Sequence, residues 1–272
     1  YTARQFLDQA LNTRSDSLSN FNRKIAGKYK AGLGLRYLAD YIGDTIISSS
    51  FKEFYKKNKL NFVKSESFKE IVSSKTSKDI NWFFDEYLTT DKKIDYTIKK
   101  AVVLDDSVYV TIKNKRNITA PVALYGLKNK QVKFKKWLTN IDSTTTVAIP
   151  KNGFDRVSLN FENSYPEFNS MDNWKKVGKN ILNKPIQFKL YKDINDPYYH
   201  QIYLQPNIKY NYYDGALLGL RIHNKPILSR NFQFSITPQY GTKSNSLNGI
   251  FNTRYIQYFE NSKINRIFYT IS

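Results

Sequence analysis

The spacing of the apolar residues changes once along the chain, close to Lys92. Before this point apolar side chains recur every three or four residues, as Leu35, Leu38 and Ile42 do, which is typical of an amphipathic helix. After it they recur every second residue, as in 108–112, which is typical of a strand. Since one bundle or one sheet cannot satisfy both patterns, we predict a multidomain chain of the α plus β class.

Residues 1–92 are the predicted helical array. Gly43 is expected to end the first long helix. Ser67 and Glu70 match the capping-box pattern, in which a hydroxyl and a carboxylate satisfy free backbone N–H groups at a helix start. Ser77 is expected to cap a last helix. The apolar faces of these helices need partners, so we expect them to pack on one another.

Short alternating runs continue from 93 to 163, with turn residues between them at 105–106 and 151–153. Strands of this length and spacing predict a small antiparallel β-sandwich. Residues 164–184 contain Pro166 and show no period, so we predict a linker there.

From 185 to 272 the alternating runs are longer and rich in Tyr and Phe. Phe232, Phe234 and Ile236, for example, alternate with polar residues. Strands of about 8–14 residues with one apolar and one polar face predict a transmembrane β-barrel, the alternative being an ordinary antiparallel sheet. A barrel needs at least about eight strands and about five are visible here, so we expect an incomplete barrel whose other strands lie beyond this chain.

Two arginines restrict how such strands can face lipid. A basic side chain turned to lipid at mid-bilayer costs about 2–4 kcal/mol. Arg221 and Arg254 are therefore expected on the polar face or near a membrane interface. The chain starts at Tyr1 without an initiator Met, and we expect it to be an internal or mature piece of a larger envelope protein.

Composition removes several function classes. There are no cysteines, which excludes disulfides, thiolate zinc sites and cysteine nucleophiles. The net charge is +20, but the basic residues are spread along the whole chain and no nucleic-acid-binding motif accompanies them. We therefore expect no nucleic acid as a partner.

Two segments resemble parts of the aminopeptidase N-like gluzincin zinc metallopeptidases. Residues 30–43 resemble a family segment in which Tyr-x-Lys-Gly precedes an amphipathic helix ending in Leu-Gly. Residues 80–88 resemble the family's Phe-Phe-x-x-Trp-Leu stretch, with Tyr87 in place of Trp. The resemblance covers 20–165 and implies the region after the zinc site, in a bacterial envelope form that continues into a C-terminal outer-membrane β-barrel.

The family's chemistry needs zinc on a His-Glu-x-x-His helix, with that Glu as the general base. His200 and His223 are the only histidines here, and both stand in strand-like sequence outside such a motif. We therefore expect no metal, no cofactor and no peptidase activity from this chain alone. Zinc is expected only in the parent, if sequence upstream of Tyr1 supplies the motif.

The resemblance also implies a tyrosine that stabilises the oxyanion of the tetrahedral intermediate. Counting back without gaps from Leu38 and Gly43 puts Lys28 at that position. Tyr29 falls one residue later, which rotates its side chain by about 100° around a helix. Tyr29 is the one catalytic candidate, and it can serve only if the helix start is irregular.

We therefore predict part of an outer-membrane-associated aminopeptidase-like protein that acts as a non-catalytic scaffold or accessory subunit of an envelope complex. The alternative is a piece of an active zinc aminopeptidase whose zinc-binding helix lies upstream, and only then is a peptide the expected substrate. A third reading is a soluble basic binding protein. The expected location is the bacterial outer membrane, with 1–92 and 93–163 outside the bilayer.

Overall fold

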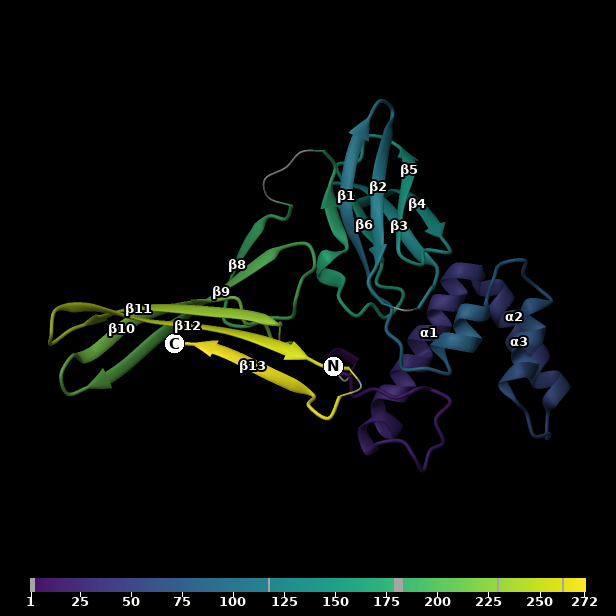
Figure 1. Cartoon of the computed structure of the whole chain (residues 1–272), viewed down its shortest axis with the longest axis horizontal. Coiled ribbons are helices and arrows are strands. Elements are labelled where there is room, and N and C mark those ends of the chain that lie inside the picture. Colours follow the sequence, from purple (N-terminus) through teal and green to yellow (C-terminus); the bar gives the residue numbers. More distant parts are fainter. Residues whose placement is uncertain (1–2, 117, 179–182, 229, 261) are drawn as a thin grey trace. The chain divides into compact units, whose positions relative to one another are not determined.

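The computed structural model describes residues 3–116, 118–178, 183–228, 230–260 and 262–272, and the parts of the predicted segments that fall elsewhere lie outside the described residues. The chain forms two compact units (Figure 1). The first, Leu7–Asn183, is called the core unit below. The second joins Ala3–Phe6 to Lys184–Ser272 and is called the sheet unit.

The helices of the core unit include two π-helical turns. Their bounds are η2 (Asn22–Ala26, π), α1 (Gly27–Ile42), α2 (Asp44–Asn58), α3 (Ser65–Ser73), η3 (Trp82–Tyr87, π) and η4 (Ser170–Asp172, 3-10). The sheet unit adds η1 (Ala3–Gln5, 3-10). No helix among the residues described is long and apolar enough to cross a membrane.

Gly43 ends α1 as predicted, with a φ of 118° that suits a residue without Cβ. The capping-box prediction is wrong, because α3 already begins at Ser65 and no side chain caps it, so Ser67 lies inside the first turn. The helix expected after Ser77 is instead the π-turn η3, and Asp79 accepts the Asn81 N–H just before it.

The β-part of the core unit consists of two antiparallel sheets (Figure 1). One has the order β1-β2-β5, formed by β1 (Tyr96–Leu104), β2 (Ser107–Asn114) and β5 (Thr144–Pro150). The other has the order β4-β3-β6-β7, formed by β3 (Val122–Lys128), β4 (Gln131–Leu138), β6 (Arg156–Leu159) and β7 (Trp174–Lys176). Side chains of both sheets pack into one hydrophobic core, as in a sandwich.

The helices and the sandwich share that core, so residue 92 does not separate independent cores. Tyr37 of α1 is fully buried, stacks on Tyr165 at 4.4 Å between ring centroids and donates its hydroxyl to the Pro121 carbonyl. Tyr165 and β7 both lie in 164–184, where we predicted a linker. That prediction is wrong for these residues, because their buried contacts come from distant parts of the chain.

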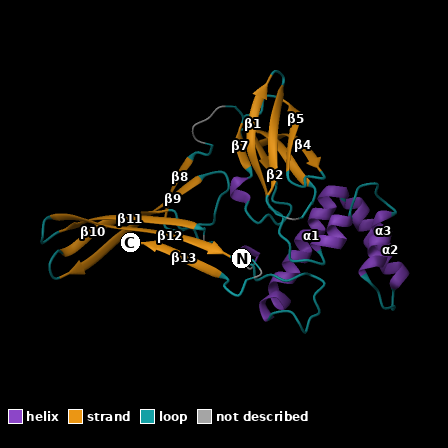
Figure 2. Ribbon diagram, viewed as in Figure 1, coloured by secondary structure: helices purple, strands orange, loops and turns teal. Residues whose placement is uncertain are grey.

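The sheet unit is one open six-stranded sheet (Figure 2). Its strands follow chain order as β13-β12-β11-β10-β9-β8. They are β8 (Ile186–Leu190), β9 (His200–Asn211), β10 (Gly215–His223), β11 (Phe232–Gly241), β12 (Ser246–Tyr258) and β13 (Arg266–Ile271). Every pair is antiparallel except β8 with β9. The predicted fold class, helices followed by antiparallel sheets, is confirmed.

Candidate functional site

The resemblance pointed to the start of α1, where Lys28 and Tyr29 lie. Both side chains are exposed. The irregularity that Tyr29 needed does exist, as the π-turn η2, but it ends at Ala26. From Gly27 to Ile42 the helix is regular, so Tyr29 keeps its ordinary α-helical register to the rest of α1. Lys28 therefore keeps the position that the resemblance gives to the oxyanion-stabilising tyrosine, and a catalytic role for Tyr29 stays a prediction.

Lys30 belongs to the same segment, and its contacts are with residues of the core unit that hold the fold together. Its ammonium lies 3.6 Å from the Asp8 carboxylate and donates to the Thr90 carbonyl at 3.4 Å. The Tyr87 hydroxyl donates to the Lys30 carbonyl at 2.8 Å. Burial lowers the pKa of Lys30, and Asp8 opposes that shift. Lys30 thus joins the chain before α1 to the end of η3.

The two histidines lie in the sheet unit. His200 is exposed at the start of β9. His223 is fully buried at the end of β10, where its Nδ1 accepts the Lys225 N–H at 3.1 Å. In the part of the chain that the structure describes, no three His, Asp or Glu side chains lie close enough together to hold a metal ion.

A group of buried carboxylates in the core unit had no signal in the sequence. Glu167 accepts the Tyr96 N–H at 2.7 Å, and burial raises its pKa well above the usual range. Burial also raises the pKa of Asp95 to about 6, against the opposing charge of Lys115 at 3.4 Å. Lys115 also pairs with Asp172 at 3.0 Å. These contacts connect the segment around 167–172 to the start of the sandwich.

The two faces of the sheet unit carry opposite kinds of side chain. Along β11, Phe232, Ile236 and Tyr240 are exposed, with Phe232 at 54%. The polar residues between them are buried, with Ser235 at 2% and Thr237 at 7%. This strand therefore hides its polar side and exposes its apolar side.

The cross-strand register extends that pattern over the sheet. Ile236 lies opposite Ile222 on β10 and Phe251 on β12. Ile222 lies opposite Leu204, and Leu204 lies opposite Leu190. The five residues of this cross-strand row, one from each of five strands, are therefore all apolar. We call this side the apolar sheet face. Its exposed members include Phe188, Leu190, Ile208, Tyr210, Leu218, Leu220, Phe232, Ile236, Tyr240, Leu247, Phe251, Tyr255, Tyr269 and Ile271.

The opposite side, called the polar sheet face, holds both arginines. Arg221 lies opposite Gln205. Arg254 lies opposite Gln233 and Thr270. Both arginines are thus kept off the apolar sheet face, as predicted.

No family model and no curated protein sequence matches the chain. Among solved structures, the chain is similar to the crystal structure of Legionella pneumophila aminopeptidase A in complex with aspartic acid. The TM-score is 0.46 with 20% sequence identity, over 52% of this chain and 17% of that chain. A TM-score of this size is too low to establish a shared fold, and this chain spans only a small part of that structure.

Proposed function

We propose that residues 185–272 are lipid-embedded strands of an outer-membrane β-barrel. The core unit is then an aminopeptidase-like module without catalysis of its own, held in the bacterial envelope by that anchor. The observation that carries the proposal is the polarity of the sheet unit, whose apolar side chains are exposed while Gln233, Ser235 and Thr237 are buried.

In water this arrangement is unfavourable. An apolar side chain left exposed forgoes about 1.5–3 kcal/mol of burial, and the apolar sheet face carries many of them. A contiguous apolar surface of this kind marks an interaction site. Lipid tails remove the penalty, and a spanning sheet then keeps its polar side away from lipid.

The strand dimensions fit a bilayer. Phe232 and Tyr240 mark the ends of the apolar stretch of β11, which extends about 27 Å at about 3.4 Å per residue. A tilt of about 40° reduces this to roughly 20 Å, close to the apolar band of about 25 Å on outer-membrane barrels. Aromatic residues lie at both ends, Tyr210 and Tyr240 near the hairpins and Tyr255 at the other end, as in the aromatic girdles of such barrels.

Unpaired strand edges cannot face lipid, because every backbone donor and acceptor must be satisfied there. The proposal therefore requires further strands that pair with both edges of the sheet unit, from a longer form of the polypeptide or, for this chain in vesicles, from further copies of it. Barrels of this class are antiparallel, so the strand that closes this edge is assigned to β9 and takes the place of β8, which pairs with β9 in parallel here.

Two features of the core unit support a role without catalysis. Lys28 occupies the position that the resemblance gives to a tyrosine, and Lys30 is engaged in structural contacts. The alternative is an active zinc aminopeptidase whose metal-binding helix lies upstream. A hydrolysis assay on aminoacyl arylamides tests whether this chain is catalytic by itself, and the same assay on a longer polypeptide that includes a metal-binding helix would separate the two readings. We expect no turnover with or without zinc, and zinc-dependent turnover by a clean preparation would contradict the proposal.

Protease protection tests the membrane part. The full chain is refolded from urea into phospholipid vesicles and treated with a protease, and the surviving fragments are identified by mass spectrometry. We expect fragments within 185–272 to survive and the core unit to be digested. A chain that does not float with the vesicles, or whose sheet unit is digested as fast with vesicles as without, would refute lipid embedding.

A further inference from the structure

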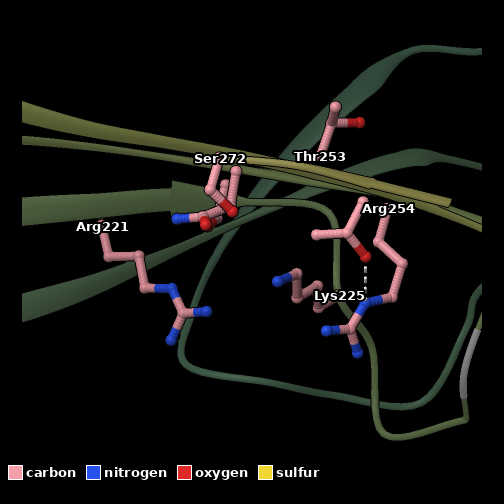
Figure 3. Close-up of a pocket in the computed structure, with 8 residues that line it drawn as sticks. Arg221, Lys225, Thr253, Arg254 and Ser272 are labelled. Carbon is pink, nitrogen blue, oxygen red and sulfur yellow. Dashed lines mark hydrogen bonds between the residues drawn. The ribbon is translucent and has the colours of Figure 1, made fainter. Parts of the chain in front are cut away.

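The polar sheet face contains a cavity of about 250 Å³ (Figure 3). Its lining comes from β10, β11, β12 and β13 and from the loop after β10. The side chains that matter for its chemistry are Arg221, Lys225, Ser235, Asn252, Arg254 and Thr270. The cavity therefore lies on the opposite side of the sheet from the apolar sheet face.

Positive charge is in excess in the cavity. Arg221, Lys225 and Arg254 all line it, no carboxylate side chain does, and the one carboxylate of the lining is the chain-terminal group of Ser272. Within the described ranges none of the three forms an ion pair, whereas Lys189 elsewhere in the sheet unit pairs with Asp193. The Nε of Arg254 donates to the Thr270 hydroxyl at 3.4 Å, a bond that orients the guanidinium but leaves its charge unbalanced (Figure 3).

One buried hydrogen-bond donor without an acceptor lies near the lining of the cavity. Ser235 of the lining lies directly opposite His223. Since the Nδ1 of His223 accepts the Lys225 N–H, the neutral ring carries its proton on Nε2. That Nε2 is buried and has no partner among the residues described. A buried donor of this kind needs an acceptor such as an ordered water, and His223 itself is not part of the lining.

We propose that this cavity binds a phosphate group. Two guanidinium groups and one ammonium group suit a doubly charged tetrahedral oxyanion, because guanidinium binds phosphate through paired N–H donors and ammonium binds it as a point charge. A single carboxylate would leave two of the three cations uncompensated. The hydroxyls of Ser235 and Thr270 and the amide of Asn252 add neutral donors.

The inference does not rest on the proposed function, because the cavity exists whatever covers the apolar sheet face. The phosphate group can come from two sources. One is free phosphate or a small phosphomonoester, and the other is the headgroup of a phosphorylated lipid. The experiment has an arm for each source.

In the first arm, the full chain in an uncharged maltoside detergent is titrated with inorganic phosphate by calorimetry, with chloride and acetate as competing anions. We expect saturable binding at one site that neither competitor displaces. In the second arm, the same protein is titrated with phosphatidylcholine vesicles that either contain or lack phosphatidic acid. Binding in the first arm assigns free phosphate, and binding only to the phosphatidic acid vesicles assigns the lipid headgroup.

Matched variants test the residues. Arg221→Gln and Arg254→Gln should each weaken binding about tenfold or more, since each removes a charge-assisted hydrogen-bond donor. Arg254→Lys keeps the charge and should weaken it less. Lys209→Gln removes one charge from an exposed position of the polar sheet face outside the cavity and should leave the affinity within about twofold.

Binding in neither arm would overturn the inference. Equal weakening by Lys209→Gln and the arginine variants would overturn it as well, because the attraction would then be that of a diffuse basic surface. A thermal unfolding curve of each variant identifies those that fail to fold. If the two glutamine variants fail to fold, the dissociation constants of Arg254→Lys and Lys209→Gln are compared instead. Weaker binding by Arg254→Lys than by Lys209→Gln supports the inference, and equal binding overturns it.

Discussion

Strands β2 and β11 have the same alternation and opposite polarity. In β2 the residues that point inward are apolar, and Val110 and Ile112 are fully buried. In β11 the buried residues are polar, among them Ser235 and Thr237, and Ile236 is exposed. The period of two reports only that a segment is a strand. Which residues are buried distinguishes the two strands further. Apolar residues buried, as in β2, suit a strand whose other side meets water, and polar residues buried, as in β11, suit a strand whose other side meets an apolar medium.

The two units therefore depend on their surroundings in different ways. The core unit has its apolar side chains, such as Leu124 and Trp82, packed inside, which is the arrangement that the hydrophobic effect favours in water. The sheet unit has its apolar side chains outside and needs lipid, detergent or a partner to cover them. Each prediction below compares a position in one region or on one face with its counterpart.

The largest expected effect is a difference in the loss of unfolding free energy between two leucine positions. Leu124→Ala opens a hole in the core unit and should lower its free energy of unfolding by about 2–5 kcal/mol. Leu218→Ala truncates an exposed side chain and should change the unfolding free energy in detergent by less than about 1 kcal/mol. Urea unfolding measures both, with tryptophan fluorescence for the core unit and circular dichroism for the whole chain.

The tryptophan signal is specific, because Trp82, Trp137 and Trp174 are the only tryptophans and all belong to the core unit. Similar losses for the two leucine variants would mean that Leu218 is packed as a core residue, which would remove the contrast between the units.

The next effect compares the two faces of β11. Ile236→Lys puts an ammonium on the apolar sheet face and should weaken insertion into vesicles by about 2–4 kcal/mol. Thr237→Lys puts it on the polar sheet face, where the cost should be clearly smaller. Equilibrium refolding into phosphatidylcholine vesicles against urea gives both values. An equal cost, or a larger one for Thr237→Lys, would reverse the assignment of the faces.

A smaller effect concerns pH and belongs to the core unit alone. Burial raises the pKa of Asp95 from 3.8 to about 6, so between these pH values the folded state holds more protons than the unfolded state. Its contribution to the free energy of unfolding is therefore present at low pH and is lost as the pH rises from about 4 to about 6, by about 1–3 kcal/mol.

Asp95→Asn should remove this part of the pH dependence, and urea unfolding of both proteins by tryptophan fluorescence at several pH values measures the difference. The sheet unit buries no carboxylate among its described residues, so its unfolding should not show the effect. A difference between wild type and variant that stays constant across this range would mean that Asp95 is not desolvated as the structure implies.

Local sequence patterns predicted much of this fold. The alternation around Val110 and around Phe234 gave both the strands and the residues that share a face, since side-chain direction in a strand follows residue number. Gly43 ended its helix because few other residues adopt its backbone angles. The same alternation placed Arg221 and Arg254 on the polar sheet face, as the cross-strand register confirms.

What the sequence did not predict depends on contacts between distant residues. The Glu167 carboxylate and the Tyr165 side chain are shielded because they meet Tyr96 and Tyr37, which are far away along the chain, and nothing in the irregular segment around them signals this. The five-residue strand β8 pairs in parallel with β9 and has no second neighbour in the sheet order. The basic cavity could not be predicted either, because it forms only once the strands are paired.

The most direct test of the central claim is the environment of adjacent positions on β11. The chain has no cysteines, so Ser235→Cys and Ile236→Cys each give a single attachment point for a fluorophore. In vesicles that contain lipids with a quencher on the acyl chain, we expect strong quenching of the label at Ile236→Cys and weak quenching at Ser235→Cys. Equal quenching at both positions, or stronger quenching at Ser235→Cys, would contradict the claim that the apolar sheet face meets lipid.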